Sequence, residues 1–122
     1  MNEISKKIEE FLDFLRETPR LYRIAEANEQ EANDITQDIL HSLELEDHDY
    51  HATAKLAKEL KEARIMRRSA KDLMAVTAPV ADWVDENKPV IKSLEQVLGY
   101  VRKAERNTEG RVYTPRTKRK EG

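Results

Sequence analysis

Three carboxylates, Glu31, Asp34 and Asp38, recur at spacings of three and four residues in a segment with helical periodicity. Side chains at this spacing lie on one face of an α-helix, so the pattern gathers oxygen ligands on adjacent turns. Such ligands suit Mg²⁺, a hard cation that binds oxygen. One hypothesis is therefore Mg²⁺-assisted chemistry on a phosphate-bearing substrate, with these three residues as metal ligands.

The same stretch carries two acid pairs, Glu26 with Glu29 and Glu31 with Asp34, each separated by Ala-Asn. This paired-acid spacing resembles that of the all-α nucleotide pyrophosphohydrolases. The resemblance implies a Mg²⁺-dependent enzyme that hydrolyses nucleoside triphosphates, with bases of the next helix contacting the phosphates. The chain departs from that family further along, where only Glu59-Leu-Lys-Glu62 stands for the second acidic pair. We therefore keep the enzyme as the alternative and expect a protein without catalytic residues, metal or cofactor.

The charge reverses sign in the next segment. Residues 26–49 contain nine acids and no Lys or Arg, whereas residues 55–71 contain seven bases and two acids. On a helix, five of these bases share an arc of about 120° beside the apolar stripe: Lys61, Arg64, Arg67, Arg68 and Lys71. This arc, the basic ridge, is the predicted partner-binding surface, because such groups bind phosphates of nucleic acid or carboxylates of protein.

The charge reversal has three interpretations. In the first, the acidic flank faces the basic ridge within one hairpin, where exposed ion pairs of about 0–1 kcal/mol each set the register of the helices. In the second, the two charged flanks form the Mg²⁺ and phosphate sites of the enzyme. In the third, one charged surface is presented to a partner. That surface is either the basic ridge or the acidic helix face, which would then mimic a nucleic acid and act as an inhibitor.

The C-terminal residues 111–122 carry five bases and one acid. We expect a flexible basic tail here, after a helical domain that spans residues 1–110. Because a tyrosine lies among the bases, the tail is a second predicted binding element, suited to stacking and phosphate contacts with single-stranded nucleic acid. Its predicted binding residues are Arg111, Tyr113, Arg116, Lys118, Arg119 and Lys120.

Three stretches resemble small helical proteins of phages and prophages of Gram-positive bacteria: DILHSLEL (38–45), KELKEARIMRRSAKDL (58–73) and LGYVRKAERNTEGRVYTPR (98–116). The resemblance implies an accessory or regulatory protein that acts on host machinery in a bacterial cytoplasm. It implies no activity and no particular functional residues.

Composition bounds the remaining possibilities. The chain has 122 residues, a net charge of −2 and no cysteine, so it is one domain without disulfides or thiolate metal sites. No apolar run approaches the ~20 residues that span a bilayer, and the N-terminus lacks the apolar core of a signal peptide. We expect a cytoplasmic protein that makes no membrane contact.

The elements that position these residues are predicted to be helices. Apolar residues recur at helical spacing and no segment alternates as a strand does, so the fold class is all-α. Breaks are expected at Thr18-Pro19, at residues 46–49, at Pro79 and at residues 87–89. The expected helices span residues 3–17, 19–45, 50–77 and 89–106. They form an elongated four-helix arrangement built on a long antiparallel hairpin of the second and third helices.

Each helix of the expected hairpin carries an apolar stripe close to a heptad. The first stripe is Leu21, Ile24, Asn28, Ala32, Ile35, Ile39 and Leu43, and the second is Leu56, Leu60, Ala63, Met66, Ala70, Leu73 and Thr77. We expect Asn28 to be a buried amide that fixes helix register. Stripes of this length are equally compatible with a homodimer.

Overall fold

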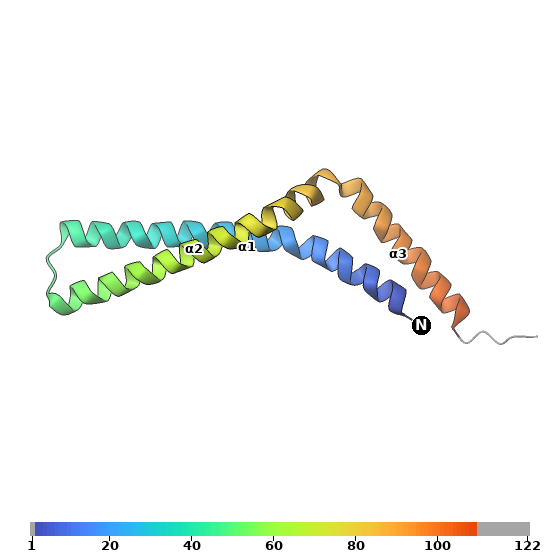
Figure 1. Cartoon of the computed structure of the whole chain (residues 1–122), viewed down its shortest axis with the longest axis horizontal. Coiled ribbons are helices and arrows are strands. Elements are labelled where there is room, and N and C mark those ends of the chain that lie inside the picture. Colours follow the sequence, from blue (N-terminus) through green and yellow to red (C-terminus); the bar gives the residue numbers. More distant parts are fainter. Residues whose placement is uncertain (1, 110–122) are drawn as a thin grey trace, which may run out of the picture. The chain divides into compact units, whose positions relative to one another are not determined.

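The computed structural model describes residues 2–109, and three helices account for nearly all of this range. They are α1 (Glu3–Leu45), α2 (Tyr50–Glu86) and α3 (Lys88–Thr108) (Figure 1). No strand is present among residues 2–109. The predicted all-α class is confirmed, but the predicted count of four helices is wrong over this range.

The count differs first because α1 passes through Pro19, where the sequence predicts a new helix. A proline inside a helix loses one backbone hydrogen bond and costs about 3 kcal/mol. The Thr18 hydroxyl donates to the Phe14 carbonyl at 2.8 Å, and the side chains of Leu15 and Thr18 are buried. Burial of this turn offsets the lost bond, so packing overrides the local signal.

The predicted end of the next helix near Thr77 is also wrong, because α2 continues through Pro79 to Glu86. The buried Thr77 hydroxyl donates to the Leu73 carbonyl at 2.7 Å. The helix ends at Asn87, whose side-chain amide donates to the Trp83 carbonyl at 2.8 Å. Pro89 then lies in the first turn of α3, where a missing backbone N–H costs little.

Residues 46–49 join α1 to α2, and α2 runs back beside the second half of α1 (Figure 1). Asp49 is the N-cap of α2, and its Oδ1 accepts a hydrogen bond from the Ala52 N–H at 2.7 Å. His48 Nε2 lies 2.9 Å from the Ser42 carbonyl oxygen, so the connection is anchored to the last turn of α1.

The chain forms two compact units. Within residues 2–109, one contains the residues up to Leu12 together with residues 89–109, and the other is Asp13–Lys88. In the second unit, buried positions repeat every seven residues on both helices: Thr18, Ala25, Ala32 and Ile39 on α1, and Ala63, Ala70 and Thr77 on α2. We call these positions the seam. Its members on the two helices lie at equal distances from the 46–49 connection, as Ala32 and Ala63 do.

The seam consists mostly of small side chains. Small residues let two helix axes approach closely, whereas a leucine at each level would hold them apart. The apolar stripe predicted for residues 19–45, now the second half of α1, is therefore partly wrong, because Leu21, Ile24 and Asn28 are exposed. Asn28 is not the expected buried amide. The predicted stripe of α2 lies close to the seam.

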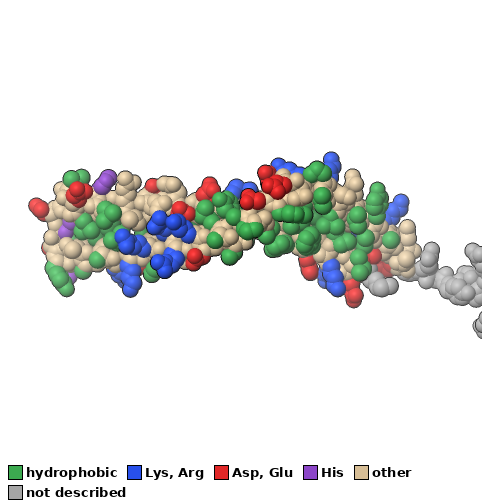
Figure 2. All heavy atoms as spheres, turned by 45° about the horizontal axis from the view of Figure 1, so that its top comes forward, with side chains coloured by type: hydrophobic (Ala, Val, Ile, Leu, Met, Phe, Trp, Pro, Cys, Tyr) green, Lys and Arg blue, Asp and Glu red, His purple; other side chains and the backbone are tan. Residues whose placement is uncertain are grey.

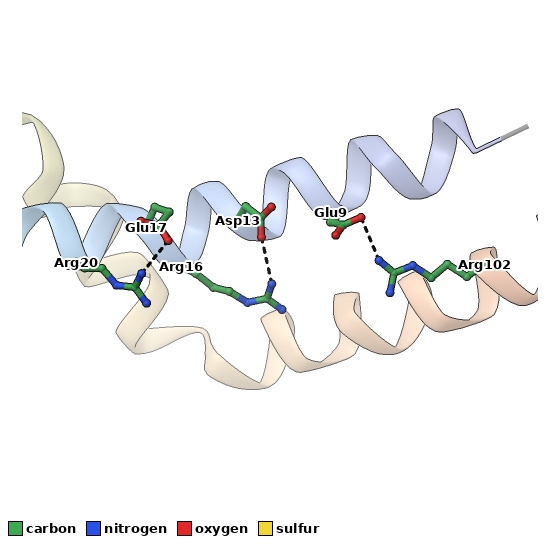
Figure 3. Close-up of polar contacts among 6 residues, drawn as sticks. All are labelled: Glu9, Asp13, Arg16, Glu17, Arg20 and Arg102. Carbon is green, nitrogen blue, oxygen red and sulfur yellow. Dashed lines mark hydrogen bonds and ion pairs between the residues drawn. The ribbon is translucent and has the colours of Figure 1, made fainter.

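The other unit pairs the first turns of α1 with α3. Leu12 and Leu98 are buried, and the Ser5 N–H donates to Glu105 Oε2 at 3.3 Å. Arg102 forms an ion pair with Glu9 at 3.1 Å (Figure 3). Within residues 2–109, no helix is both long enough and apolar enough to cross a membrane.

Candidate functional site

A groove on the Asp13–Lys88 unit brings together four of the five bases of the predicted ridge. Arg64, Arg67, Arg68 and Lys71 line it from α2 together with Asp72, and Asn33 and Thr36 line it from α1. We call this surface the basic groove. Figure 2 shows Lys and Arg side chains clustered over α2 on this unit.

Helical geometry explains why these bases gather. Arg64, Arg67, Arg68 and Lys71 are three or four residues apart, so they project from successive turns on one side of α2. Lys61, the fifth base of the ridge, lies on the adjoining surface with Leu60, Ile65 and Ser69. The predicted ridge is therefore divided. Four of its bases line the basic groove, and the fifth, Lys61, lies beside the groove.

The bases of the groove have no acidic partner in the described part of the chain. Ion pairs of that part involve other residues, among them Asp13 with Arg16, Glu17 with Arg20, Asp85 with Lys88 and Glu9 with Arg102 (three of them in Figure 3). No acid of residues 26–49 is paired with the ridge. The interpretation that facing flanks form ion pairs within one hairpin is therefore wrong for residues 2–109.

The α1 wall of the groove is polar and uncharged. Asn33 is half-buried, and its amide can both donate and accept. The Thr36 hydroxyl donates to the Ala32 carbonyl at 2.8 Å. Arginine guanidinium groups present paired N–H donors that match a carboxylate or a phosphate. The groove is thus chemically suited to bind an anionic group.

The three predicted Mg²⁺ ligands are not gathered into a site. Glu31, Asp34 and Asp38 are exposed on α1, and Asp34 Oδ1 accepts a hydrogen bond from Gln30 Nε2 at 3.0 Å. Residues 2–109 contain no group of three or more His, Cys, Asp or Glu side chains placed to hold a metal ion. The helical spacing puts the carboxylates on one side of α1, but no second element adds ligands to them.

Sequence reasoning missed three residues of the groove: Asn33, Thr36 and Asp72. Asn33 and Thr36 flank the seam position Ala32, so the pairing of the two helices brings them to the bases. Two polar residues that are three positions apart and lie next to an alanine of the seam form the sequence pattern that could have predicted the place of Asn33 and Thr36. The predicted tail residues Arg111, Tyr113, Arg116, Lys118, Arg119 and Lys120 lie outside the described residues.

No protein family, no curated protein and no solved structure matches this chain. The basic groove is therefore the feature from which a function can be inferred.

Proposed function

We propose that this chain is a non-enzymatic interaction protein that binds an acidic segment of a partner protein in the basic groove. The antiparallel hairpin of α1 and α2 is its scaffold. The observation that carries the proposal is the absence of ion pairs, among the described residues, at Arg64, Arg67, Arg68 and Lys71, although all four line one groove.

Four bases line the groove against the single carboxylate of Asp72, so an excess of positive charge remains, and a bound carboxylate relieves the repulsion among the bases. Charge-assisted hydrogen bonds of this kind contribute about 1.5–3 kcal/mol each. The uncharged wall at Asn33 leaves room for a peptide backbone, to which an amide both donates and accepts. Asp72, at the edge of the same groove, suits an N–H or an ammonium group of the partner.

The groove favours a protein segment over nucleic acid as the ligand. The span from Arg64 to Lys71 is about 10 Å at 1.5 Å per residue, which is short beside the 6–10 phosphate contacts that give strong salt dependence to DNA binding. Residues 26–49, with nine acids, belong to the same unit. They would repel a long polyanion but not a short acidic segment.

The wider role follows the resemblance to small phage and prophage proteins. We place this chain among accessory or regulatory proteins that act on host machinery in a bacterial cytoplasm. The basic residues of the tail, Arg111 to Lys120, extend the same binding preference for anionic groups.

Binding of two labelled probes, a glutamate-rich peptide and a short DNA single strand, tests the proposal. We expect the peptide to bind the full chain and Arg64→Glu/Arg67→Glu/Arg68→Glu to weaken this binding by about a hundredfold. Far-UV circular dichroism should show unchanged helical content. The matched control, Lys7→Glu/Arg23→Glu/Lys103→Glu, makes the same charge change at exposed positions outside the groove.

The controls separate the competing functions. An equal loss in both triple variants would show a general charge effect and would reject the groove. Tighter binding of the DNA strand, with a steep dependence on salt, would assign the groove to nucleic acid. Hydrolysis of a nucleoside triphosphate with Mg²⁺, abolished by Asp34→Asn/Asp38→Asn, would establish the enzyme alternative.

A further inference from the structure

The Asp13–Lys88 unit leaves large apolar side chains outside its seam. Val76 is 70% exposed, Ile65 57% and Ile24 48%, and Leu21, Leu73 and Trp83 are also exposed. The seam between the helices holds mainly alanine and threonine. More apolar surface therefore lies outside this helix pair than is usual for a monomer, in which large exposed side chains are scattered singly.

Most of these side chains lie on one side of the helix pair. At about 100° per residue, the same side of the seam carries Leu21, Ile24 and Ile35 from α1 and Leu73, Val76 and Trp83 from α2. We call this side the apolar face. A groove of about 300 Å³ continues it, lined by Ile35, Ala63 and Met66 with Glu59 and Glu62. Arg67 and Lys71 fall on the opposite side, where the basic groove lies.

We propose that a second copy of this chain covers the apolar face and that two hairpins thereby form a four-helix bundle. Four-helix bundles pack such stripes around a common core. A two-fold interface joins the same patch from both copies, so the patch must be self-complementary. Leu21 and Ile24 of one copy then lie against Leu73 and Val76 of the other, because these residues stand at similar distances from the 46–49 connection.

Charge selects a second copy as the occupant. Asp38 on α1 and Lys58 on α2 border the apolar face from its two edges, and both are exposed. Neither forms an ion pair within the described part of the chain. They stand nearly equally far from the connection, about ten residues along each helix. In the dimer, Asp38 of each copy therefore meets Lys58 of the other.

The same charges select the symmetry axis. A two-fold axis parallel to the helices sets α1 of one copy against α2 of the other. Asp38 then meets Lys58 and apolar end meets apolar end, while Glu31 and Glu62 are the like charges that approach each other. An axis perpendicular to the helices sets α1 against α1, which brings acids together, a costly arrangement. The inference is independent of the proposed function, since the basic groove lies on the other side and stays open.

Sedimentation equilibrium of the full chain tests the dimer. The expected mass is twice the chain mass of 14.2 kDa, and Ile24→Glu/Val76→Glu should shift it to that of the monomer. Leu40→Glu/Tyr50→Glu is the control, because both side chains are exposed on the opposite side of the seam. Circular dichroism monitors the fold. A monomeric wild-type chain, or a dimer unaffected by Ile24→Glu/Val76→Glu, would overturn the proposal.

A charge-exchange experiment tests the arrangement without disturbing the core. Asp38→Lys and Lys58→Asp each create two repulsive contacts in a homodimer and should each raise its dissociation constant by about tenfold. An equimolar mixture restores acid against base at both contacts, so we expect the mixed dimer to form with wild-type affinity. A mixture that associates no better than either variant alone would refute the parallel axis. Arg64→Glu/Arg67→Glu/Arg68→Glu should leave the dimer intact, which separates this test from that of the groove.

Discussion

Glu9 Oε2 lies 3.1 Å from a guanidinium nitrogen of Arg102, which joins the first turns of α1 to the last half of α3 (Figure 3). The same unit contains a further polar contact and two buried leucines. Ser5 donates its backbone N–H to Glu105, and Leu12 and Leu98 are buried one or two turns away. The two ends of the described chain are therefore held together by a polar edge beside a small apolar core.

Glu9→Gln should lower the free energy of unfolding by about 0.2–1 kcal/mol, because both partners are half-exposed. A double-mutant cycle with Arg102→Gln, measured by urea unfolding, gives the coupling energy. Added salt should reduce this coupling. Glu10→Gln, at the exposed neighbouring position, is the control and should show no coupling to Arg102.

Asp49→Ala should destabilise the chain by about 1 kcal/mol, because the first turn of α2 loses the acceptor of the Ala52 N–H. Asp49→Asn keeps an acceptor oxygen and should retain most of this free energy. Thermal unfolding followed at 222 nm measures both. Asp47→Ala, in the same connection, is the control, and an equal effect there would contradict the cap.

Ala63→Leu should cost about 1–3 kcal/mol, because a larger side chain in the seam forces α1 and α2 apart. The same substitution at the exposed Ala57 is the matched control and should change stability little. Chemical unfolding compares the two variants. Similar stability of both would mean that the helices are not closely packed at the seam.

Pro19→Ala should stabilise the chain by about 1–3 kcal/mol, because it restores a backbone N–H inside α1. Hydrogen exchange should then show added protection around this turn. Thr18→Val removes the hydroxyl that donates to the Phe14 carbonyl and serves as the comparison. Destabilisation by Pro19→Ala would instead assign the half-buried ring a packing role that outweighs the lost hydrogen bond.

Features that depend on neighbours in the chain were predictable from the sequence. Helical periodicity indicated the all-α class, and the polar segment 46–49 indicated the connection between α1 and α2. The bases from Arg64 to Lys71 gather because residues three and four apart share one side of any helix. Each of these features is decided within a few turns of backbone.

Tertiary structure decided which signals prevailed. Pro19 and Pro79 predict breaks, yet both lie inside helices whose neighbouring threonines, Thr18 and Thr77, are buried. The larger side chains Leu21 and Ile24 look like the inner stripe, yet the small residues of the seam are buried instead. Close approach of two helices favours alanine over leucine at their contact, and a single helix does not reveal which stripe its neighbour will cover.

The site divides in the same way. The sequence by itself determined that five bases share one arc of α2 and that nine acids precede them. Only the pairing of α1 with α2 placed Asn33 and Thr36, rather than acids, beside these bases. Register between two helices is set by side chains far apart in the chain, whereas the positions along one helix follow from its own periodicity.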